Sequence, residues 1–411
     1  MPPSTPHRRR GFTGRDPEEK HRVSTPLELF YDLTVVIAFG VASDELAHFV
    51  AEGHAWAGIV GFAFACFAVI WAWLNYSWFA SAYDTDDWFF RLATMVQMVG
   101  VIVLALGLPQ MFGSIDHGDT LKNGVMVLGY VIMRVSQLTL WWQVSRHDPE
   151  RAPAARTYIT AIGIAQIGWV ILALVGLPVA ETFALMSICF AIELVGPYLA
   201  ERKASTPWHA HHIAERYGLM VIITLGEVLI GTVAALNALV HGEAGWSLDA
   251  GLLALAGVGL AFGCWWVYFA IRWADALDRR RGRGFLFGWG HMLVFAPLAA
   301  MGSGLHVAAY KLGGETEITD VSVVLSVAIP VAIFTAVIYG LYSLLLSEQD
   351  PFHVLLLLGT AVLLVASVVL AGVGVSMVVC LLVVMLAPVV TVVGYETVGH
   401  RHMAEAIERI G

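Results

Sequence analysis

Charged residues are scarce in this chain of 411 residues. Only 13% of the residues are Asp, Glu, Lys or Arg, while 58% are hydrophobic, and the mean hydropathy is +0.74. A soluble protein of this length with that composition would have a mostly apolar surface, which excludes an ordinary soluble globular protein. The composition predicts an all-α polytopic membrane protein whose first partner is the lipid bilayer.

Other absences exclude several classes of function. Each of the four cysteines lies in an apolar run, and none has metal-ligand spacing. The sequence contains no metal tetrad, nucleophile elbow, phosphate-binding loop or dinucleotide fingerprint. No cluster alternates basic and aromatic residues in the manner of a nucleic-acid interface. We therefore expect no metal, no cofactor, no nucleic-acid partner and no enzymatic activity.

Long apolar runs divide the chain into membrane spans. A spanning helix needs roughly 20 mostly apolar residues, and this criterion predicts about twelve. A count of eleven stays open, because only Gly372, Val373 and Gly374 separate the last two runs. The expected spans are 27–49, 57–79, 90–111, 121–144, 155–177, 180–199, 215–240, 248–272, 285–310, 321–346, 353–371 and 375–395.

Basic residues, nearly all Arg, are concentrated in alternate loops and in both tails. Cytoplasmic loops of membrane proteins carry such an excess, so we expect a multi-pass protein of the plasma membrane with both termini cytoplasmic. Residues 1–22 are expected to form a disordered tail, and 397–411 a cytoplasmic tail. The tryptophans near the expected cytoplasmic helix ends, such as Trp71, Trp73 and Trp141, are interpreted mainly as an interfacial belt.

An internal repeat relates the two halves of the chain. Residues 28–40 read ELFYDLTVVIAFG, and residues 215–227 read ERYGLMVIITLGE. Four further residues of the first half match the second half at one constant offset: Trp73, Tyr76, Asp86 and Arg91 match Trp265, Tyr268, Asp278 and Arg283. Six is an even number of spans, so the repeats 23–200 and 201–396 are expected to be parallel.

Ionisable residues inside the apolar runs are the candidate functional residues, because a charge at membrane depth is costly. At about 1.5 Å of rise per residue, Arg134 and Glu227 lie near the midplane and Asp32 lies closer to the cytoplasmic side. The candidates for transport or proton binding are Glu227, Asp32, Arg134, Glu193, His291, Glu28 and Glu215. Polar support is expected from Asn75, Tyr76, Gln97 and Gln137.

Several of these residues have two interpretations. Arg134 needs a carboxylate partner, either Glu193 or Glu227, in a static or a switchable pair. Glu28 closes a capping box with Thr25 and has a structural role on that interpretation. Burial makes Glu227 a proton-binding group unless Arg134 holds it ionised, and His291 is either a proton relay or a packing residue.

Two loop features complete the candidates. The pairs Asp86 with Arg91 and Asp278 with Arg283 act either as structural clamps or as a cytoplasmic gate. The histidines at positions 209, 211 and 212 lie together before the seventh span. We interpret them as residues of a solvated loop rather than as a metal site.

The segments 28–33, 73–79, 84–87 with Arg91, 215–219 and 225–227 together resemble the bacterial low temperature requirement protein A family. The resemblance extends from about residue 23 to residue 395. It implies a polytopic membrane fold, and it marks nine positions as matches to the family pattern, without implying a particular reaction. These positions are Glu28, Asp32, Asn75, Tyr76, Asp86, Arg91, Glu215, Gly226 and Glu227.

The leading functional hypothesis is a secondary transporter of a small solute or ion, coupled to protons through buried carboxylates. The alternative is a cation or proton channel. Residues 30–32 (FYD) are similar to the Phe-Ser-Asp of endolysosomal potassium channels, although Tyr31 replaces the Ser and no filter-like run occurs. A third hypothesis is a membrane-embedded enzyme that acts on lipid, for which no known template of residues is present.

Overall fold

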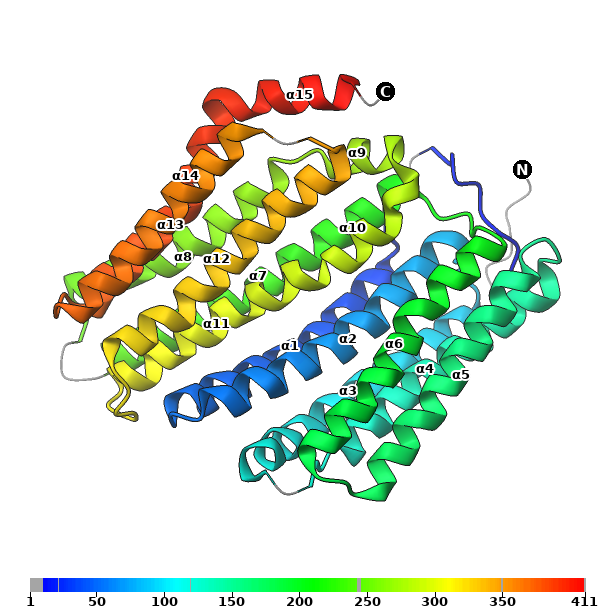
Figure 1. Ribbon diagram of the computed structural model, residues 1–411, viewed down its shortest axis with the longest axis horizontal. Helices are drawn as coiled ribbons and strands as arrows, with labels where there is room; N and C mark the ends of the chain where they lie inside the picture. Colours follow the sequence, from blue (N-terminus) through cyan, green and yellow to red (C-terminus); the bar gives the residue numbers. More distant parts are fainter. Residues whose placement is uncertain (1–9, 21, 119, 242–244, 349, 410–411) are drawn as a thin grey trace. The chain divides into compact units, whose positions relative to one another are not determined.

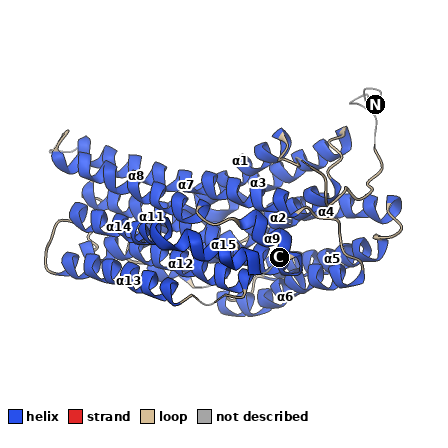
Figure 2. Cartoon of the chain, turned by 90° about the horizontal axis from the view of Figure 1, so that it is seen from above, coloured by secondary structure: helices blue, strands red, loops and turns tan. Residues whose placement is uncertain are grey.

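The computed structural model describes residues 10–20, 22–118, 120–241, 245–348 and 350–409. These residues form helices joined by short loops, and none of them belongs to a β-strand (Figure 2). Thr120 and Pro178 make an isolated antiparallel bridge. The expected all-α fold is therefore confirmed.

Two compact units divide the chain. Unit 1 comprises Met1–Ala42 and Phe64–Ile213, and unit 2 comprises Ser43–Ala63 and Ala214–Gly411. These units differ from the expected halves 23–200 and 201–396, because 43–63 belong to unit 2. The predicted repeat relationship between the halves stays a prediction.

Unit 1 is built mainly from the first six helices (Figure 1). Within it α3 packs on α4, α4 on α5, and α5 on α6. A Cβ atom added at Gly129 of α4 would lie 2.2 Å from the backbone nitrogen of Leu104 of α3, so only glycine permits this approach of the two backbones. The six helices are α1 (Pro26–Ala51), α2 (Ala55–Tyr83), α3 (Trp88–His117), α4 (Gly124–His147), α5 (Ala152–Val175) and α6 (Val179–Lys203).

Unit 2 is built mainly from the later helices, with α11 packed on α12 and α14 packed on α8 and α13. These are α7 (Ala210–Val240), α8 (Leu248–Phe269), α9 (Trp273–Arg279), α10 (Gly284–Gly290), α11 (Met292–Leu312), α12 (Asp320–Leu346), α13 (Pro351–Gly372), α14 (Met377–Gly394) and α15 (His400–Arg409). A short 3₁₀ turn, Arg281–Arg283, precedes α10, and a π-helical turn, Tyr395–Gly399, precedes α15.

Among the described residues, twelve helical segments are long and apolar enough to cross a membrane. This number confirms the count of twelve over eleven, since α13 and α14 are separate helices. Two expected spans are less regular than the sequence suggested. The helix expected over 248–272 ends at Phe269 and is followed by α9, and the helix expected over 285–310 is divided at His291 into α10 and α11.

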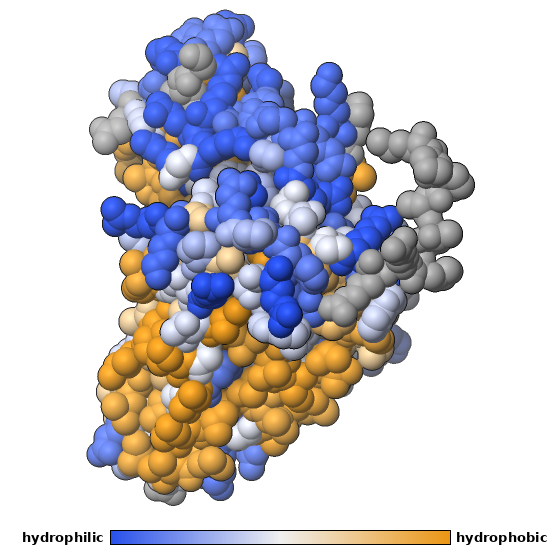
Figure 3. Space-filling view, turned by 90° about the vertical axis from the view of Figure 1, so that its right-hand side faces the viewer, coloured by the Kyte–Doolittle hydropathy of each residue, from blue (hydrophilic) through white to orange (hydrophobic). Residues whose placement is uncertain are grey.

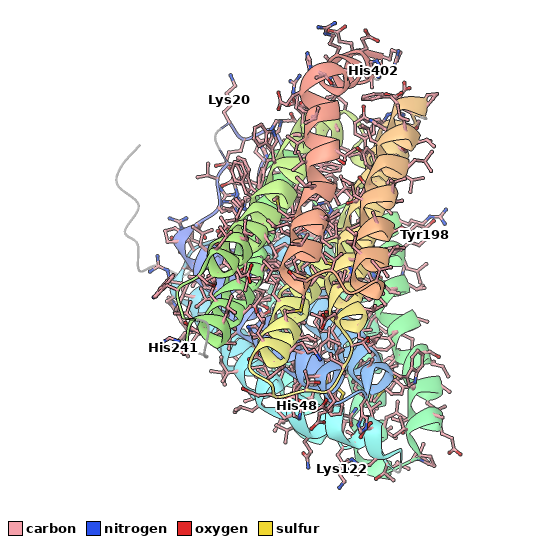
Figure 4. All side chains as sticks on the ribbon, turned by 90° about the vertical axis from the view of Figure 1, so that its left-hand side faces the viewer. Lys20, His48, Lys122, Tyr198, His241 and His402 are labelled. Carbon is pink, nitrogen blue, oxygen red and sulfur yellow. The ribbon has the colours of Figure 1, made fainter. Side chains whose placement is uncertain are left out.

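Exposed apolar side chains cover the flanks of the helices, as a lipid-facing surface requires. Leu106 and Leu174 of unit 1 are 73% and 80% exposed, and Val362 of unit 2 is 66% exposed. Figure 3 shows a broad orange surface of such residues, with hydrophilic side chains gathered apart from it. In unit 1, Lys20 and Lys122 lie at opposite ends of the helices (Figure 4). Three helices, α1 to α3, separate them in the chain, and an odd number of spans takes the chain from one end to the other.

Residues 10–20 pack against unit 1 and do not form the disordered tail expected for 1–22. Phe12 is fully buried, and its ring lies 6.2 Å from that of Phe79 and 6.1 Å from that of Phe89. The backbone N–H of Arg10 donates to Asp87, and that of Gly14 donates to Asp148. Residues 1–9 and 21 of the expected tail lie outside the described residues.

Candidate functional site

Glu193 of α6 is the centre of a buried network in unit 1. Its Oε2 accepts hydrogen bonds from Arg134 Nη2 at 2.6 Å and from Trp71 Nε1 at 2.9 Å. Its Oε1 accepts from the Tyr130 hydroxyl at 3.0 Å and from Gln166 Nε2 at 2.9 Å. Four donors from α2, α4 and α5 thus bind one carboxylate. Such a complete set of hydrogen bonds is needed to offset the desolvation cost of a buried ion pair.

Arg134 therefore pairs with Glu193, one of the two partners that the sequence left open. Its side chain is 1% exposed, and its Nε and Nη1 atoms are buried without a hydrogen-bond partner among the described residues. The same holds for both amide atoms of Gln137 and for Nε2 of Gln97. Ser136 Oγ donates to the Ala93 carbonyl oxygen at 2.7 Å. This hydrogen bond links α4 to α3 one residue before Gln137. Gln97 and Gln137 are thus buried residues of α3 and α4 whose amides do not bond to the ion pair.

Asp32 of α1 forms a second buried contact in the same unit. Its Oδ1 accepts a hydrogen bond from Trp73 Nε1 at 2.7 Å, and the preceding Tyr31 places its ring 4.1 Å from that of Tyr76. Tyr76 in turn shares a hydrogen bond with Thr94, while Asn75 donates to the backbone oxygen of Trp71. Asp32, Asn75 and Tyr76 are thus buried together on α1 and α2.

The tryptophans of α2 correct one expectation. Trp71 and Trp73 are each 1% exposed, and their indole N–H groups bind the carboxylates of Glu193 and Asp32. Trp141 is also 1% exposed and stacks on Tyr158 with ring centroids 4.0 Å apart. These three residues are buried in unit 1 rather than forming an interfacial belt. Composition suggested a belt because it does not show which face of a helix is buried.

Glu28 forms the hydrogen bonds that the capping box predicts, and it also contacts a histidine and an arginine. The Thr25 backbone N–H donates to Glu28 Oε2 at 2.7 Å, and the Glu28 N–H donates to Thr25 Oγ1 at 3.3 Å. Glu28 Oε1 also lies 3.2 Å from His212 Nε2 and 3.8 Å from Arg22 Nη2. Glu28 is fully buried, so the Arg22 charge and the contact with His212 compensate the cost of its burial.

Asp84 shares Arg22 with Glu28, at the loop that follows α2. The distance from Arg22 Nη2 to Asp84 Oδ2 is 3.7 Å. Burial, with the nearby Glu28 carboxylate, raises the pKa of Asp84 to about 6. Burial also lowers the pKa of Arg22, although Glu28 opposes this shift. The two carboxylates and Arg22 form a buried triad in which the pKa of Asp84 is raised.

The histidine cluster is only partly solvated: His211 is exposed, whereas His209 and His212 are buried, and His211 and His212 belong to α7. His212 is fully buried and His209 is 8% exposed. His209 Nε2 lies 2.9 Å from the carbonyl oxygen of Glu19, and its backbone N–H donates to Ser81. The part of the chain that the structure describes contains no group of residues suited to hold a metal.

Glu227 of α7 lies in unit 2, where its surroundings differ. It is 4% exposed and has no hydrogen-bond or ion-pair partner among the residues that the structure describes. A Cβ added at Gly302 of α11 would lie 2.5 Å from the carbonyl oxygen of Glu227 and 3.0 Å from its Cβ. The glycine therefore lets α11 approach the backbone of α7 at Glu227 itself.

A histidine and an aspartate accompany Glu227. His306 follows Gly302 by one turn of α11, and its Nδ1 lies 2.9 Å from Asp44 Oδ1. Asp44 and His306 are the titratable residues that interact electrostatically with Glu227. The Asp44 side chain is 64% exposed, whereas that of His306 is only 16% exposed. His306 Nε2 is buried without a hydrogen-bond partner in the described chain. Titratable groups thus extend from an exposed aspartate toward a buried glutamate.

Both ring nitrogens of His291, at the junction of α10 and α11, have hydrogen-bond partners. Its Nδ1 lies 2.7 Å from the Phe287 carbonyl oxygen, which can only accept, so this nitrogen carries the proton. Its Nε2 then accepts from the Tyr268 hydroxyl at 2.9 Å. The rings of Tyr217 and Phe287 lie 5.0 Å and 4.2 Å from the imidazole. This geometry holds a neutral histidine in an aromatic cage and favours the packing interpretation.

The two loop pairs differ from each other. Arg91 binds Asp86 through both Nε and Nη2, at 2.9 and 3.0 Å. Asp278, in contrast, binds Arg281 at 3.1 Å, and Arg283 donates to the carbonyl oxygens of Leu344 and Leu345. The expected pair of Asp278 with Arg283 is therefore wrong, because the chain turns through Arg281–Arg283 and directs Arg283 toward the end of α12.

Glu215 is a partly exposed residue of α7 in unit 2. The functional candidates that sequence reasoning missed are Arg22, Asp84, His306, Asp44 and Glu201. Glu201 accepts hydrogen bonds from Trp78 and Tyr158. Sequence position hid most of them, because each lies at a helix end or in a loop where a polar residue needs no explanation. The exception is His306, whose place within an apolar run was a usable signal.

Comparison with known proteins adds to this geometry. Over 310 residues the chain is 26% identical to the uncharacterized protein RA0937 of Rhizobium meliloti (strain 1021), and the match covers 70% of each chain. No solved structure matches the chain. Residues 23–388 match the family described as Bacterial low temperature requirement A protein (LtrA). With most of its length matched, the chain belongs to the bacterial low temperature requirement A family.

Proposed function

We propose that the protein is a secondary transporter of a small solute or ion, and that Glu227 is the group that binds the coupling proton. The observation that carries this proposal is the difference between the buried carboxylates. Glu227 is buried without a bonded partner among the described residues, whereas Glu193 accepts four hydrogen bonds. A carboxylate within a membrane span that has no fixed countercharge is able to change protonation during a transport cycle.

The neighbours of Glu227 supply a route for that proton. Asp44 is exposed and contacts His306 Nδ1, while the other imidazole nitrogen has no bonded partner in the described residues. Histidine exchanges protons near neutral pH. In the proposed cycle His306 passes a proton between Asp44 and Glu227. Protonation of Glu193 is unsuited to this role, because it would leave the buried Arg134 without its countercharge.

The test is flux in liposomes that contain the purified protein and a trapped pH dye. Potassium and proton gradients are imposed, and wild type is compared with Glu227→Gln. Glu317→Gln serves as the matched control, because Glu317 is an exposed loop carboxylate of the same unit. We expect Glu227→Gln to lower proton flux at least tenfold and Glu317→Gln to leave it unchanged.

The same assay separates the transporter from the channel alternative. Flux that appears only when a solute is added supports a coupled carrier. Flux that needs only a membrane voltage and falls with Glu227→Gln indicates a proton or cation channel instead. Absence of flux from folded protein with every gradient and solute tested would contradict both functions.

We infer further that the protein resides in the plasma membrane with both termini in the cytoplasm, and that it acts without an enzymatic step or cofactor. The excess of Arg in alternate loops and tails supports the orientation. Reporter fusions that are active only in the cytoplasm, placed after Arg22 and after Arg409, test this orientation. Activity of only one of the two fusions would contradict an even number of spans.

A further inference from the structure

The outer surface of α5 and α6 carries a groove that the proposed transport route does not use. These two helices pack side by side (Figure 1), and the groove between them has a volume of about 690 Å³. Its walls are exposed aliphatic side chains of both helices, among them Ile164, Ile188 and Val195. A Cβ added at Gly196 would lie 2.5 Å from the Cβ of Ala161, so small residues bring the helices close at its floor.

One end of the groove is basic. Arg156 belongs to the first turns of α5 and Lys203 is the last residue of α6, and both line the groove. Lys203 Nζ donates to Thr157 Oγ1 at 2.9 Å, which places the ammonium group beside α5. Neither Arg156 nor Lys203 forms an ion pair with any described residue, and both are exposed. Two positive charges are therefore available at the mouth of an apolar groove.

The neighbouring basic residue is already engaged. The Arg202 guanidinium lies 5.6 Å from the centroid of the Tyr198 ring, and Figure 4 shows Tyr198 projecting outward from α6. Arg202 therefore stacks on its own helix, which leaves Arg156 and Lys203 as the pair facing the groove.

We propose that this groove binds one anionic phospholipid from the surrounding leaflet. The headgroup phosphate contacts Arg156 and Lys203, and an acyl chain lies along the aliphatic walls. Charge complementarity selects the occupant, since basic pockets between spanning helices bind anionic headgroups. The apolar groove then distinguishes an intact lipid from a free phosphate.

Native mass spectrometry of the full-length protein, released from detergent with a defined lipid, tests the proposal. The probes are phosphatidylglycerol and phosphatidylcholine with the same oleoyl chains. We expect wild type to retain one phosphatidylglycerol at least tenfold more often than phosphatidylcholine. Equal retention of the two lipids would overturn the proposal, because it would show an unselective annular lipid.

Two variants assign the site. The double variant Arg156→Gln/Lys203→Gln is expected to lose the preference for phosphatidylglycerol. The control is Lys20→Gln/Lys122→Gln, which removes the same charge from two exposed residues of unit 1 that do not line the groove. Retained preference in the first double variant, or its loss in the control, overturns the assignment. Thermal unfolding of each variant establishes that it is folded.

A third variant tests the apolar part of the site. Ala191→Phe adds a ring to an exposed lining position of α6 without changing charge. We expect it to lower retention of phosphatidylglycerol at least fivefold. A further probe is glycerol 3-phosphate in tenfold excess over phosphatidylglycerol, which we expect to leave the lipid bound. Displacement by this headgroup analogue, or full retention in Ala191→Phe, would show that the groove does not hold a lipid chain.

Discussion

Two buried glutamates, Glu193 of unit 1 and Glu227 of unit 2, have the same side chain and nearly the same burial, at 1% and 4% exposure. They differ in their partners. Glu193 accepts four hydrogen bonds, one of them from Arg134. Glu227 instead packs against the backbone of Gly302 and has Asp44 and His306 as titratable neighbours. Burial alone therefore does not distinguish a structural carboxylate from a proton-binding one; the number of fixed donors does.

The largest expected effect on stability is at Glu193. Glu193→Gln leaves Arg134 buried without a countercharge, and breaking a buried pair in this way costs about 3–5 kcal/mol. Glu227→Gln removes no bonded contact and is expected to change the unfolding free energy by less than about 1 kcal/mol. Denaturant unfolding in one detergent measures both.

A reversed order of these two costs would remove the basis for assigning the proton to Glu227. The double variant Arg134→Met/Glu193→Gln sharpens the comparison, because it removes the unpaired charge. It is expected to be more stable than Glu193→Gln alone.

A smaller and pH-dependent effect is expected at Asp84, a third buried carboxylate. Its pKa is about 6 in the folded protein against a reference of 3.8, so the folded state binds the proton more tightly than the unfolded state. The resulting stabilisation is fully present below about pH 4 and is lost as pH rises through 6. At 1.36 kcal/mol per pH unit, the change is at most about 3 kcal/mol.

Asp84→Asn is expected to remove that dependence. Unfolding free energies measured between pH 4 and 7 for wild type and Asp84→Asn provide the test. Parallel profiles of the two proteins would show that another group of the triad takes up the proton.

The smallest effect is expected at the exposed pair of Asp86 and Arg91. Solvent screens an exposed ion pair, so it contributes little to stability, and Asn tolerates the left-handed backbone that Asp86 adopts, with φ of 46°. Asp86→Asn should therefore leave the denaturant midpoint of unfolding unchanged. If it instead altered transport while stability was kept, the gate interpretation of this loop would be supported over the clamp.

Much of the fold was predictable because each span has to satisfy the membrane by itself. A helix in lipid bonds its own backbone groups and needs a fixed apolar length. This requirement explains why about twelve spans were recognisable from sequence. The capping box at Thr25 and Glu28 was predictable for the same reason, since its two hydrogen bonds are local. The separation of α13 from α14 was left open by the sequence and was decided by the structure.

The partners of the candidate residues were less predictable because they are far apart in the chain. Arg134 and Glu193 were both singled out, yet only packing of α4, α5 and α6 selects Glu193 over Glu227. His212 was interpreted as a loop residue, although it lies against Glu28, 184 positions away. Nothing local distinguished the buried Trp71 and Trp73 from the exposed Trp142, because hydropathy does not say which face of a helix meets protein.

The sequence by itself determined the membrane class, the family and the set of ionisable residues to consider, and it left the helix count at eleven or twelve. The tertiary structure alone decided which of those residues have a compensating partner. The hydrogen-bond donors and countercharges that stabilise a buried carboxylate come from other helices. The tertiary structure also decided that Asp278 pairs with Arg281 and that Arg156 and Lys203 meet at one groove. The energy of two charges in a low-dielectric interior depends on the distance between them. For residues far apart in the chain, only packing of the helices sets that distance.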